Sequence, residues 1–356
     1  MTGIEAVLTV DLGAIAANWR QLAAAGPVAG VVKADGYGLG TAPVGRALLA
    51  AGCRHFFVAH LSEGVALRAA IGAGPMIAVL NGFPPGADDG AGLVPVLNGL
   101  PDVAAWTAAA RAAERALPAI LHVDTGMARL GLDAGELERV AEDHGLLAGL
   151  DLRYVMTHLA CADAPEHPLN ADQARRFAAA CARLPPAPRS FANSSGLFLG
   201  PDFASDLGRP GCALYGINPT PGRPNPMRQA VGLEAPILQV REIAAGTPVG
   251  YGASWTAPRP SRIATVAAGY ADGYLRALSG RATGILAGRP VPLVGRVSMD
   301  LITFDVTDVP PPAPGDRIGL IGPGLTPDDL ATAAGTIGYE ILTSLGARYR
   351  REYRGA

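Results

Sequence analysis

The lysine content of the chain points to amine chemistry. Lys33 is the only lysine among 356 residues, and the other 28 members of the Lys+Arg total are arginines. A guanidinium stays protonated at physiological pH, whereas a buried ε-ammonium can lose its proton and then act as a nucleophile or a base. A lysine that is kept in a chain otherwise using only arginine suits a Schiff base with a carbonyl, for example the aldehyde of pyridoxal phosphate. The alternative is a solvated lysine that survived by chance.

The residues around Lys33 favour a turn that brings the backbone close to a ligand. Lys33 ends an apolar run, Gly30–Lys33, that is typical of a strand, and three glycines follow within seven positions. Glycine adopts the left-handed conformations that a tight turn requires. Tyr37 lies in this turn, where its hydroxyl could bind a phosphate or its ring could pack.

Charged residues also follow later predicted strands. Arg129 lies in the segment Asp124–Gly131 and could bind a carboxylate through two parallel hydrogen bonds, or be an ordinary surface cation. His158 follows the strand predicted at Leu152–Thr157, where a hydrogen-bonded core histidine is the alternative to a catalytic one. Each signal is weak when it is taken alone.

Two further segments complete the set. Asn193–Gly196 offers Ser194 and backbone amides that could bind a phosphate or cap a helix. Arg209 lies beside a glycine turn in the segment Arg209–Gly216. Taken together, the segments predict a rim that binds phosphate and carboxylate groups around a nucleophilic lysine.

Alternating strands and helices must position these groups. Such a rhythm predicts a parallel sheet, and seven or eight such units in about 220 residues fit a (β/α)₈ TIM-like barrel, whose active sites lie at the carboxyl ends of the strands. The predicted strands are Gly30–Lys33, His55–Ala59, Met76–Leu80, Leu93–Val96, Ala119–Val123, Leu152–Thr157 and Arg189–Ala192. The predicted helices include Leu12–Ala24, Ala42–Ala51, Asp102–Ala116, Gly135–Glu142 and Asn170–Ala182.

The sequence pattern changes after a Pro- and Gly-rich linker at 219–226. Short alternating runs with closely spaced turn residues then predict a mainly β C-terminal domain, with a helical segment around Thr326–Leu345. We therefore expect a barrel over 10–226 and a β-rich domain over 227–356. The predicted strands of the second part are Ile237–Ile243, Arg262–Ala267, Thr283–Leu286, Val291–Val294, Leu301–Val306 and Asp316–Ile321.

Composition excludes several classes of protein. A net charge of −2 with 17% charged residues and no basic run argues against nucleic-acid binding. No signal peptide or unbroken apolar stretch indicates membrane insertion. Four scattered cysteines without a CxxC pair fit a reducing cytoplasm, and no histidine spacing suggests a metal site.

The ordered motifs resemble those of the alanine racemase family. They are AGVVKADGYGLG, HVDTGMARLG, MTHLACAD, ANSSG, RPGCALYG, GYGASW, AAGYADGY, GRVSMD and GYE, and they extend from about Leu8 to Tyr349. The resemblance implies a pyridoxal 5'-phosphate barrel followed by a β-domain that also takes the first strand (1–9), in a head-to-tail homodimer. It implies interconversion of L- and D-alanine, serving either D-alanine supply for peptidoglycan or alanine breakdown.

The resemblance also implies roles for individual residues. Lys33 would hold the cofactor and act as the base on one face of Cα, and Tyr251 of the other subunit would act on the opposite face. His158 and Arg209 would form the network behind Tyr251, and Arg209 would face the pyridine nitrogen. The cofactor's phosphate would be held by Tyr37, Ser194, Tyr339 and the backbone amides of Gly211 and Cys212.

Substrate binding would use residues of both subunits. Arg129 would contact the substrate carboxylate and the cofactor's phenolic oxygen, assisted by the backbone amide of Met299 from the partner. Tyr270 from the partner would lie at the narrow entrance, although a structural role for it is also open.

Two positions depart from the family's pattern. Many members carry a carbamylated lysine where this chain has His122, so we expect Arg129 to be held instead by an anion, a water or another side chain. Leu39 stands where histidine is frequent, and we expect this change to be tolerated.

Three other functions remain open. A racemase of broader range, acting on serine or basic amino acids, would share these motifs. A decarboxylase of the same barrel class usually sets an acidic residue against the pyridine nitrogen, which Arg209 argues against. A non-catalytic pyridoxal-phosphate carrier would lack a β-domain bearing Tyr251 and Met299.

Overall fold

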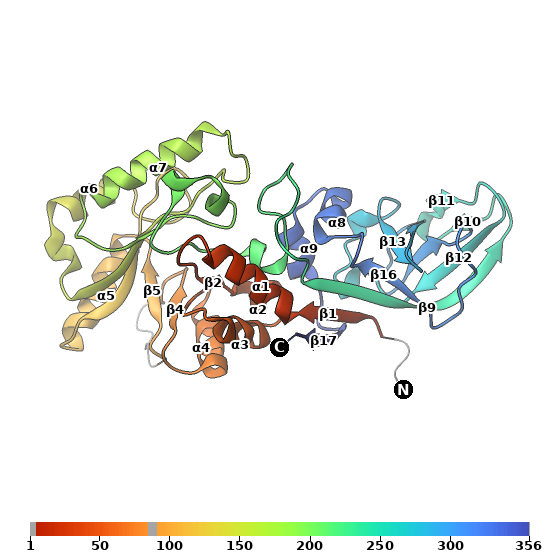
Figure 1. Ribbon diagram of the computed structural model, residues 1–356, viewed down its shortest axis with the longest axis horizontal. Helices are drawn as coiled ribbons and strands as arrows, with labels where there is room; N and C mark the ends of the chain where they lie inside the picture. The colour runs from red at the N-terminus through yellow and green to blue at the C-terminus, as the bar shows by residue number, and fades with distance from the viewer. Residues whose placement is uncertain (1–4, 85–90, 356) are drawn as a thin grey trace.

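The described part of the chain forms two large sheets, one after the other along the long axis of the molecule, and one small two-stranded sheet (Figure 1). The computed structural model describes residues 5–84 and 91–355. One sheet has seven parallel strands, and the other has eight strands that are mostly antiparallel. This arrangement confirms the predicted TIM-like barrel followed by a mainly β part. The exact boundary between the two domains stays a prediction.

The parallel sheet carries its strands in sequence order, as a βα barrel requires. Its central strands are buried, because helices cover the outside and side chains fill the inside, so they are nearly continuous apolar runs. The strands are β2 Gly30–Val31, β3 His55–Val58, β4 Met76–Val79, β5 Val94–Leu97, β6 Leu117–His122, β7 Leu150–Met156 and β8 Arg189–Ser190.

An extended segment at 207–210 closes this sheet into a ring. On one side, the Arg209 amide donates to the Ala192 carbonyl at 2.8 Å, just beyond β8. On the other side, the Ala29 amide donates to the Gly208 carbonyl at 2.8 Å, just before β2. The eighth place of the barrel is therefore occupied by backbone too irregular to count as a strand.

Helices surround the barrel, and most of its strands are followed by a helix that begins after a connecting segment. α6 shows how such a start is encoded, because the Asp133 carboxylate accepts from the Glu136 amide at 2.8 Å while the Glu136 side chain accepts from the Asp133 amide. The long helices are α1 Leu12–Ala23, α3 Thr41–Ala51, α4 Leu61–Ile71, α5 Leu100–Ala112, α6 Ala134–Glu142 and α7 Pro168–Cys181.

The second sheet is built on the long strand β9, Val231–Ile243. The first strand of the chain, β1 Val7–Asp11, pairs with β9 and, in parallel, with the last strand, β17 Arg350–Arg354. The other strands are β12 Ser261–Val266, β13 Thr283–Leu286, β14 Arg289–Pro292, β15 Ile302–Asp305 and β16 Arg317–Ile321, with a separate pair, β10 Pro248–Val249 and β11 Trp255–Thr256.

The C-terminal helical segment differs from the prediction. The structure divides Thr326–Leu345 into α8, Pro327–Ala334, and α9, Gly338–Ser344. Gly335 separates them with a φ of 74°, the left-handed conformation in which glycine commonly ends a helix. This break lets α9 turn toward the barrel.

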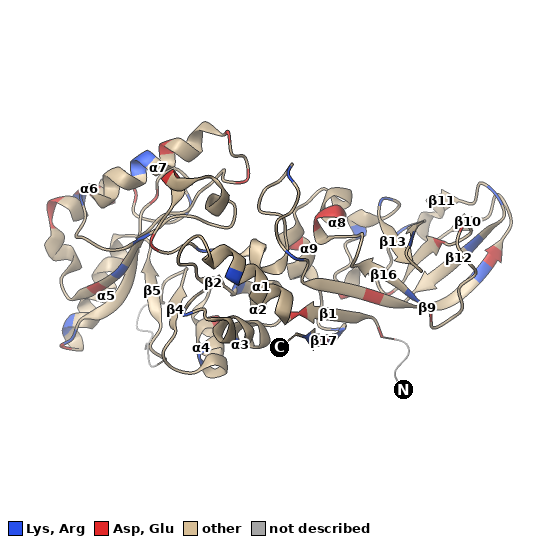
Figure 2. Cartoon of the chain, in the orientation of Figure 1, with Lys and Arg blue, Asp and Glu red and all other residues tan. Residues whose placement is uncertain are grey.

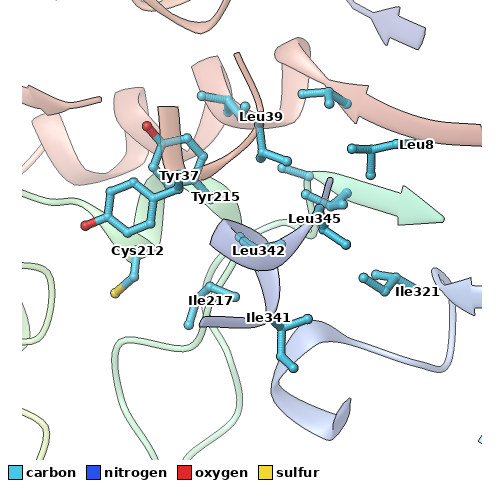
Figure 3. Packing of buried hydrophobic residues seen from close by; sticks show 14 of the residues in the cluster. Leu8, Tyr37, Leu39, Cys212, Tyr215, Ile217, Ile321, Ile341, Leu342 and Leu345 are labelled. Atoms are coloured by element: carbon cyan, nitrogen blue, oxygen red, sulfur yellow. The ribbon is translucent and has the colours of Figure 1, made fainter. Parts of the chain in front are cut away.

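One continuous apolar core joins the two parts (Figure 3). The ring of Tyr37 stacks on that of Tyr215, with centroids 4.6 Å apart. Leu342 and Leu345, at the end of α9, belong to the same core as Leu8 of β1. The β-domain is therefore fixed against the carboxyl end of the barrel and can contribute residues there.

Charged residues of both signs are interspersed over both parts (Figure 2). Within 5–84 and 91–355, no helix is long and apolar enough to cross a membrane.

Candidate active site

A cavity of about 580 Å³ opens at the carboxyl ends of the barrel strands. It receives side chains from segments that follow six of the strands and from α9 of the β-domain. Nine of the predicted site residues line it: Lys33, Tyr37, Arg129, His158, Ser194, Arg209, Gly211, Cys212 and Tyr339. The predicted rim is therefore one contiguous surface.

Lys33 lies at the start of an unusual turn. β2 ends at Val31, two residues earlier than predicted, and Lys33 opens the short helical turn α2, Lys33–Tyr37. Ala34, Asp35 and Tyr37 have φ values of 52°, 54° and 56°. Left-handed backbone is unfavourable for residues with a Cβ, so surrounding contacts must hold this turn.

The cavity lowers the pKa of the Lys33 amine. Burial is the main cause, and the positive charge of Arg129 adds to it. The Glu63 carboxylate acts in the opposite direction, and Arg209 lowers the pKa further. The net shift raises the fraction of neutral amine, the form that nucleophilic and base chemistry requires.

Arg209 is buried on the inside of the ring. Its guanidinium donates to the Ser190 hydroxyl at 2.7 Å and to the Thr157 carbonyl at 2.6 Å. Burial lowers its pKa to about 10, so it still carries its charge at neutral pH. The site thus contains a fixed, buried cation.

His158 lies against Arg209 and is neutral. Burial, and then the charge of Arg209, hold the His158 pKa well below its ordinary value. Arg209 Nη2 lies 3.3 Å from His158 Nδ1, and a guanidinium can only donate. Nδ1 is therefore the acceptor, which assigns the ring proton to Nε2.

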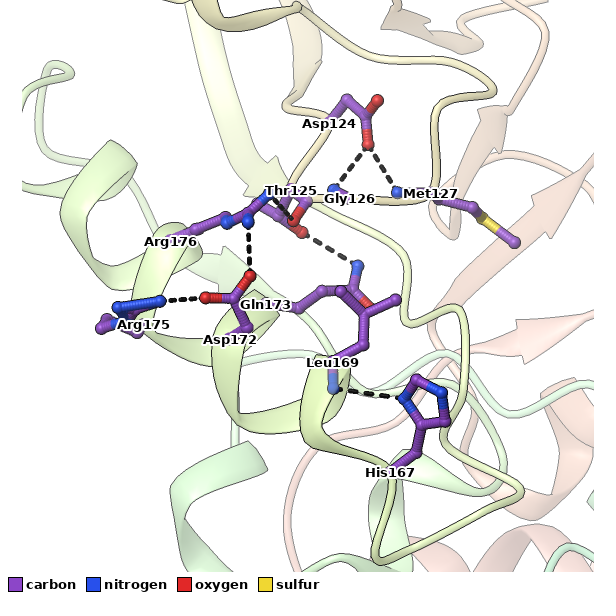
Figure 4. Close-up of polar contacts among 10 residues, drawn as sticks. All are labelled: Asp124, Thr125, Gly126, Met127, His167, Leu169, Asp172, Gln173, Arg175 and Arg176. Atoms are coloured by element: carbon purple, nitrogen blue, oxygen red, sulfur yellow. Dashed lines mark hydrogen bonds and ion pairs between the residues drawn. The ribbon is translucent and has the colours of Figure 1, made fainter.

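The loop after β6 positions Arg129. Asp124 accepts from the amides of Gly126 and Met127 (Figure 4) and from that of Ala128, each at 2.9 Å, and so closes the loop. Ala128, immediately before Arg129, has a φ of 54°. Arg129 therefore extends from a loop that is held closed by Asp124, and its side chain lines the cavity.

Gln173, buried on α7, connects this loop to the strand beside it. Its amide donates to the Thr125 hydroxyl at 3.0 Å and to the His158 carbonyl at 2.9 Å, and its oxygen accepts from the Ala160 amide. Figure 4 shows the side chain reaching Thr125 from the helix. One residue thus ties the Arg129 loop to the His158 segment.

His122 also lines the cavity, in a defined tautomer. The Asn98 amide nitrogen donates to the carbonyls of Leu80 and Val96, so Asn98 Oδ1, at 2.8 Å, faces His122 Nδ1 as an acceptor. Nδ1 must then carry the proton. Burial, and then Arg209, lower the His122 pKa to about 4, so Nε2 remains a bare acceptor at neutral pH.

Backbone amides and hydroxyls form a cradle on the opposite side. The Ser194 hydroxyl accepts from the amides of Gly211 and Ala213, at 2.9 and 3.3 Å. A Cβ on Gly211 would lie 2.1 Å from the Tyr37 hydroxyl oxygen, so only glycine fits there. Asn193, rather than Ser194, caps the following turn, by accepting from the Gly196 amide.

The three remaining predicted residues lie away from this cavity. Tyr251, Tyr270 and Met299 belong to the β-domain and are 72%, 42% and 54% exposed. Tyr251 lies between β10 and β11, at the end of the molecule farthest from the barrel (Figure 1). They are not brought together with Lys33 within one chain.

Sequence reasoning missed three residues that hold the rim: Glu63, Asn98 and Gln173. Glu63 is the third residue of α4 and accepts from the amide of His60, the residue before that helix, but histidine is not among the usual N-cap residues and gives no sequence signal. Asn98 and Gln173 act through distant partners, so no local signal marks them. Among the described residues, no group of three or more His, Cys, Asp or Glu gathers as a metal site would require.

Known proteins share this architecture over nearly its whole length. Residues 10–219 match the family model of the alanine racemase N-terminal domain, and residues 230–353 match that of the C-terminal domain. An alanine racemase of Acidiphilium cryptum is 58% identical, covering 97% of each chain. A catabolic alanine racemase of Mesorhizobium japonicum is 52% identical, covering 98% of this chain and 93% of its own.

Solved structures agree with the sequence relatives. The alanine racemase of Bartonella henselae, solved with covalently bound pyridoxal phosphate, superposes with a TM-score of 0.95 at 43% identity, covering 98% of this chain and 99% of its own. The biosynthetic enzyme of Pseudomonas aeruginosa gives a TM-score of 0.92 at 36% identity, over 99% of this chain and all of its own. This chain belongs to the alanine racemase family.

Proposed function

We propose that this chain interconverts L- and D-alanine, with pyridoxal 5'-phosphate bound at Lys33. The observation that carries the proposal is the position of the only lysine, in a cavity beside two arginines and opposite a cradle of amides and hydroxyls. The Bartonella henselae structure holds pyridoxal phosphate covalently, which supports the same cofactor here.

The donor set of the cavity fits this cofactor. The Gly211 and Ala213 amides converge on the Ser194 hydroxyl oxygen, which leaves the hydroxyl hydrogen to donate to a phosphate. Tyr37 and Tyr339 contribute hydroxyls, and burial raises the pKa of both, so they stay protonated as donors. When bound, the cofactor supplies an aldehyde for the amine and a ring that withdraws electrons from Cα.

Lys33 is the base on one face of Cα. Its lowered pKa raises the fraction of neutral amine, which can accept a proton near neutral pH. Arg209 keeps its positive charge inside the barrel and cannot give up a proton near neutral pH. We infer that Arg209 faces the pyridine nitrogen and leaves it unprotonated.

Arg129 binds the substrate carboxylate. It leaves a loop held by Asp124 and lines the cavity, and a guanidinium pairs with a carboxylate through two parallel hydrogen bonds. His122 is the side chain we propose to hold Arg129, because its Nε2 is a bare acceptor at the same cavity.

A second base must act from the opposite face, and we infer that Tyr251 of another copy supplies it. Racemisation removes a proton from one face and returns one to the other, so two groups must flank Cα. Within its own chain Tyr251 is exposed and far from the cavity, which suits a residue that works in a head-to-tail homodimer. Tyr270 and Met299, also exposed, would accompany it.

We also infer a cytoplasmic location. All four cysteines are free, and Cys53 and Cys212 are buried, which suits a reducing compartment.

Racemisation assays test the function. We expect the full-length protein to convert each alanine enantiomer, with slower initial rates on D-serine and D-lysine. Lys33→Ala should lose alanine turnover, and continued turnover by this variant would contradict the proposal.

A further inference from the structure

The turn that carries Lys33 needs external support. Its backbone stays left-handed from Ala34 to Tyr37, and only one of these four residues is glycine. Such a turn persists only where surrounding groups hold it. The Asp35 carboxylate accepts from the Thr41 amide at 2.8 Å, and from the β-domain Arg351 donates to the Gly38 carbonyl at 2.6 Å. Neither contact involves Ala34, the residue that directly follows Lys33.

Glu63 holds that residue directly. Its Oε1 accepts from the Ala34 amide at 2.7 Å. Its Oε2 accepts from the amides of Ala59 and His60, at 2.7 and 3.1 Å. One carboxylate thus joins the segment after β2 to the segment after β3, and both Ala34 and Ala59 line the cavity.

Glu63 also supplies negative charge to a cationic site. Besides burial, Arg129 and Arg209 lower the pKa of Lys33, whereas among the described residues only Glu63 raises it. Without this carboxylate, only cations would act on the amine. The same oxygen atoms that fix the turn therefore counteract the two arginines.

We propose that Glu63 is a positioning residue for the Lys33 amine, which it orients through the Ala34 amide and to which it presents a negative charge. The catalytic use of Lys33 rests on the proposed function. The contacts of Glu63 and its charge beside the amine are independent of that function. A measurement on the amine itself therefore tests it separately.

The lone lysine makes this measurement specific. In full-length protein freed of cofactor, an amine-reactive reagent can label only Lys33 and the N-terminal amine, which mass spectrometry of peptides separates. The labelling rate against pH then reports the pKa of Lys33. Lys33→Ala gives the background.

Glu136 provides a matched control. Like Glu63, it is half-buried, is the third residue of a helix and completes a capping box, and it too reaches the amide of another segment, Leu100 at 3.0 Å. It does not line the cavity. Glu136→Gln and Glu63→Gln therefore remove the same kind of charge, and only the second does so beside Lys33.

In Glu63→Gln, we expect the labelling profile to move to lower pH, with labelling roughly threefold or more faster below the transition, because a tenfold change in neutral fraction accompanies each pKa unit. We expect kcat for alanine to fall about tenfold or more, since the amine is misplaced. Glu136→Gln should leave both unchanged.

Two outcomes would overturn the role. One is a labelling profile of Glu63→Gln that matches the wild type. The other is an equal shift in Glu136→Gln, which would mean that capping alone is responsible.

If Glu63→Gln does not fold, Glu63→Asp serves as the test variant. It keeps the charge but shortens the reach to Ala34, so a wild-type kcat would overturn the positioning role. Failure of racemisation in the wild type would instead contradict the proposed function and leave the labelling result standing.

Discussion

Arg209 Nη2 lies 3.3 Å from Nδ1 of His158, and both side chains line the cavity, Arg209 buried and His158 half-buried. Because the guanidinium cannot accept, the contact fixes the ring proton of His158 on Nε2. The pair is therefore a cation and an oriented neutral imidazole. The pair therefore places one positive charge, that of Arg209, in the site, and neither Arg209 nor His158 titrates near neutral pH.

Arg209→Lys tests whether the guanidinium geometry matters beyond its charge. A single ammonium cannot keep the contacts to Ser190, Thr157 and His158 together, so we expect kcat for alanine to fall by roughly 10²-fold. Steady-state kinetics measures this, with the exposed Arg223→Lys as the control. A kcat close to that of the wild type would show that charge alone suffices.

Gln173→Leu should loosen the Arg129 loop. The change removes the contacts to Thr125 and to the His158 carbonyl, so we expect the free energy of unfolding to fall by about 1–3 kcal/mol and KM for alanine to rise. Denaturant unfolding and initial rates measure the two effects. Arg175→Ala, which removes an exposed ion pair with Asp172 on the same helix, should change neither. An unaltered KM in Gln173→Leu would remove the link to Arg129.

Gly211→Ala should weaken cofactor binding. The new Cβ would lie 2.1 Å from the Tyr37 hydroxyl oxygen, so the tyrosine must leave the cradle. We expect the Kd for pyridoxal phosphate to rise at least about tenfold, which corresponds to 1.4 kcal/mol. Titration of the cofactor's absorbance measures it. Gly322→Ala, where a Cβ meets nothing within 4 Å, is the control, and equal Kd values for the two variants would contradict the cradle.

The pKa of His122 predicts acid sensitivity. Its folded-state pKa is about 4, below the ordinary 6.5, so the unfolded chain binds a proton between these values and the folded chain does not. Stability is therefore full above pH 6.5 and falls as the pH drops toward 4, by about 1.4 kcal/mol per unit for this group.

His122→Gln should flatten that dependence. Urea unfolding of cofactor-free protein at pH 5 and pH 7, at one protein concentration, measures it. A variant whose stability falls as steeply as that of the wild type would show that other groups, such as His158, account for the loss.

The sequence predicts the frame of the molecule well because its strands are marked locally. Buried parallel strands are apolar runs, and catalytic groups follow their carboxyl ends, so the sequence alone suffices to place Lys33, Arg129 and His158 on one rim. By contrast, β17 has the sequence Arg-Arg-Glu-Tyr-Arg and becomes a strand only because it pairs with β1.

Supports of the rim could not be predicted, because they depend on residues far apart in the chain. The left-handed turn after Lys33 depends on Glu63, 29 positions from Ala34, and on Arg351, which comes from the other end of the chain. The tautomer of His122 depends on how the Asn98 amide is held. Such contacts exist only once the barrel has closed.

Mixing two inactive variants tests the central claim, that Lys33 of one chain and Tyr251 of another share a site. Lys33→Ala and Tyr251→Phe should each be nearly inactive as separate proteins. In a mixed dimer, one site receives Lys33 from one chain and Tyr251 from the other and is intact. Random exchange in a 1:1 mixture should therefore restore about a quarter of wild-type alanine racemisation. A mixture that stays as inactive as its components would contradict the shared site.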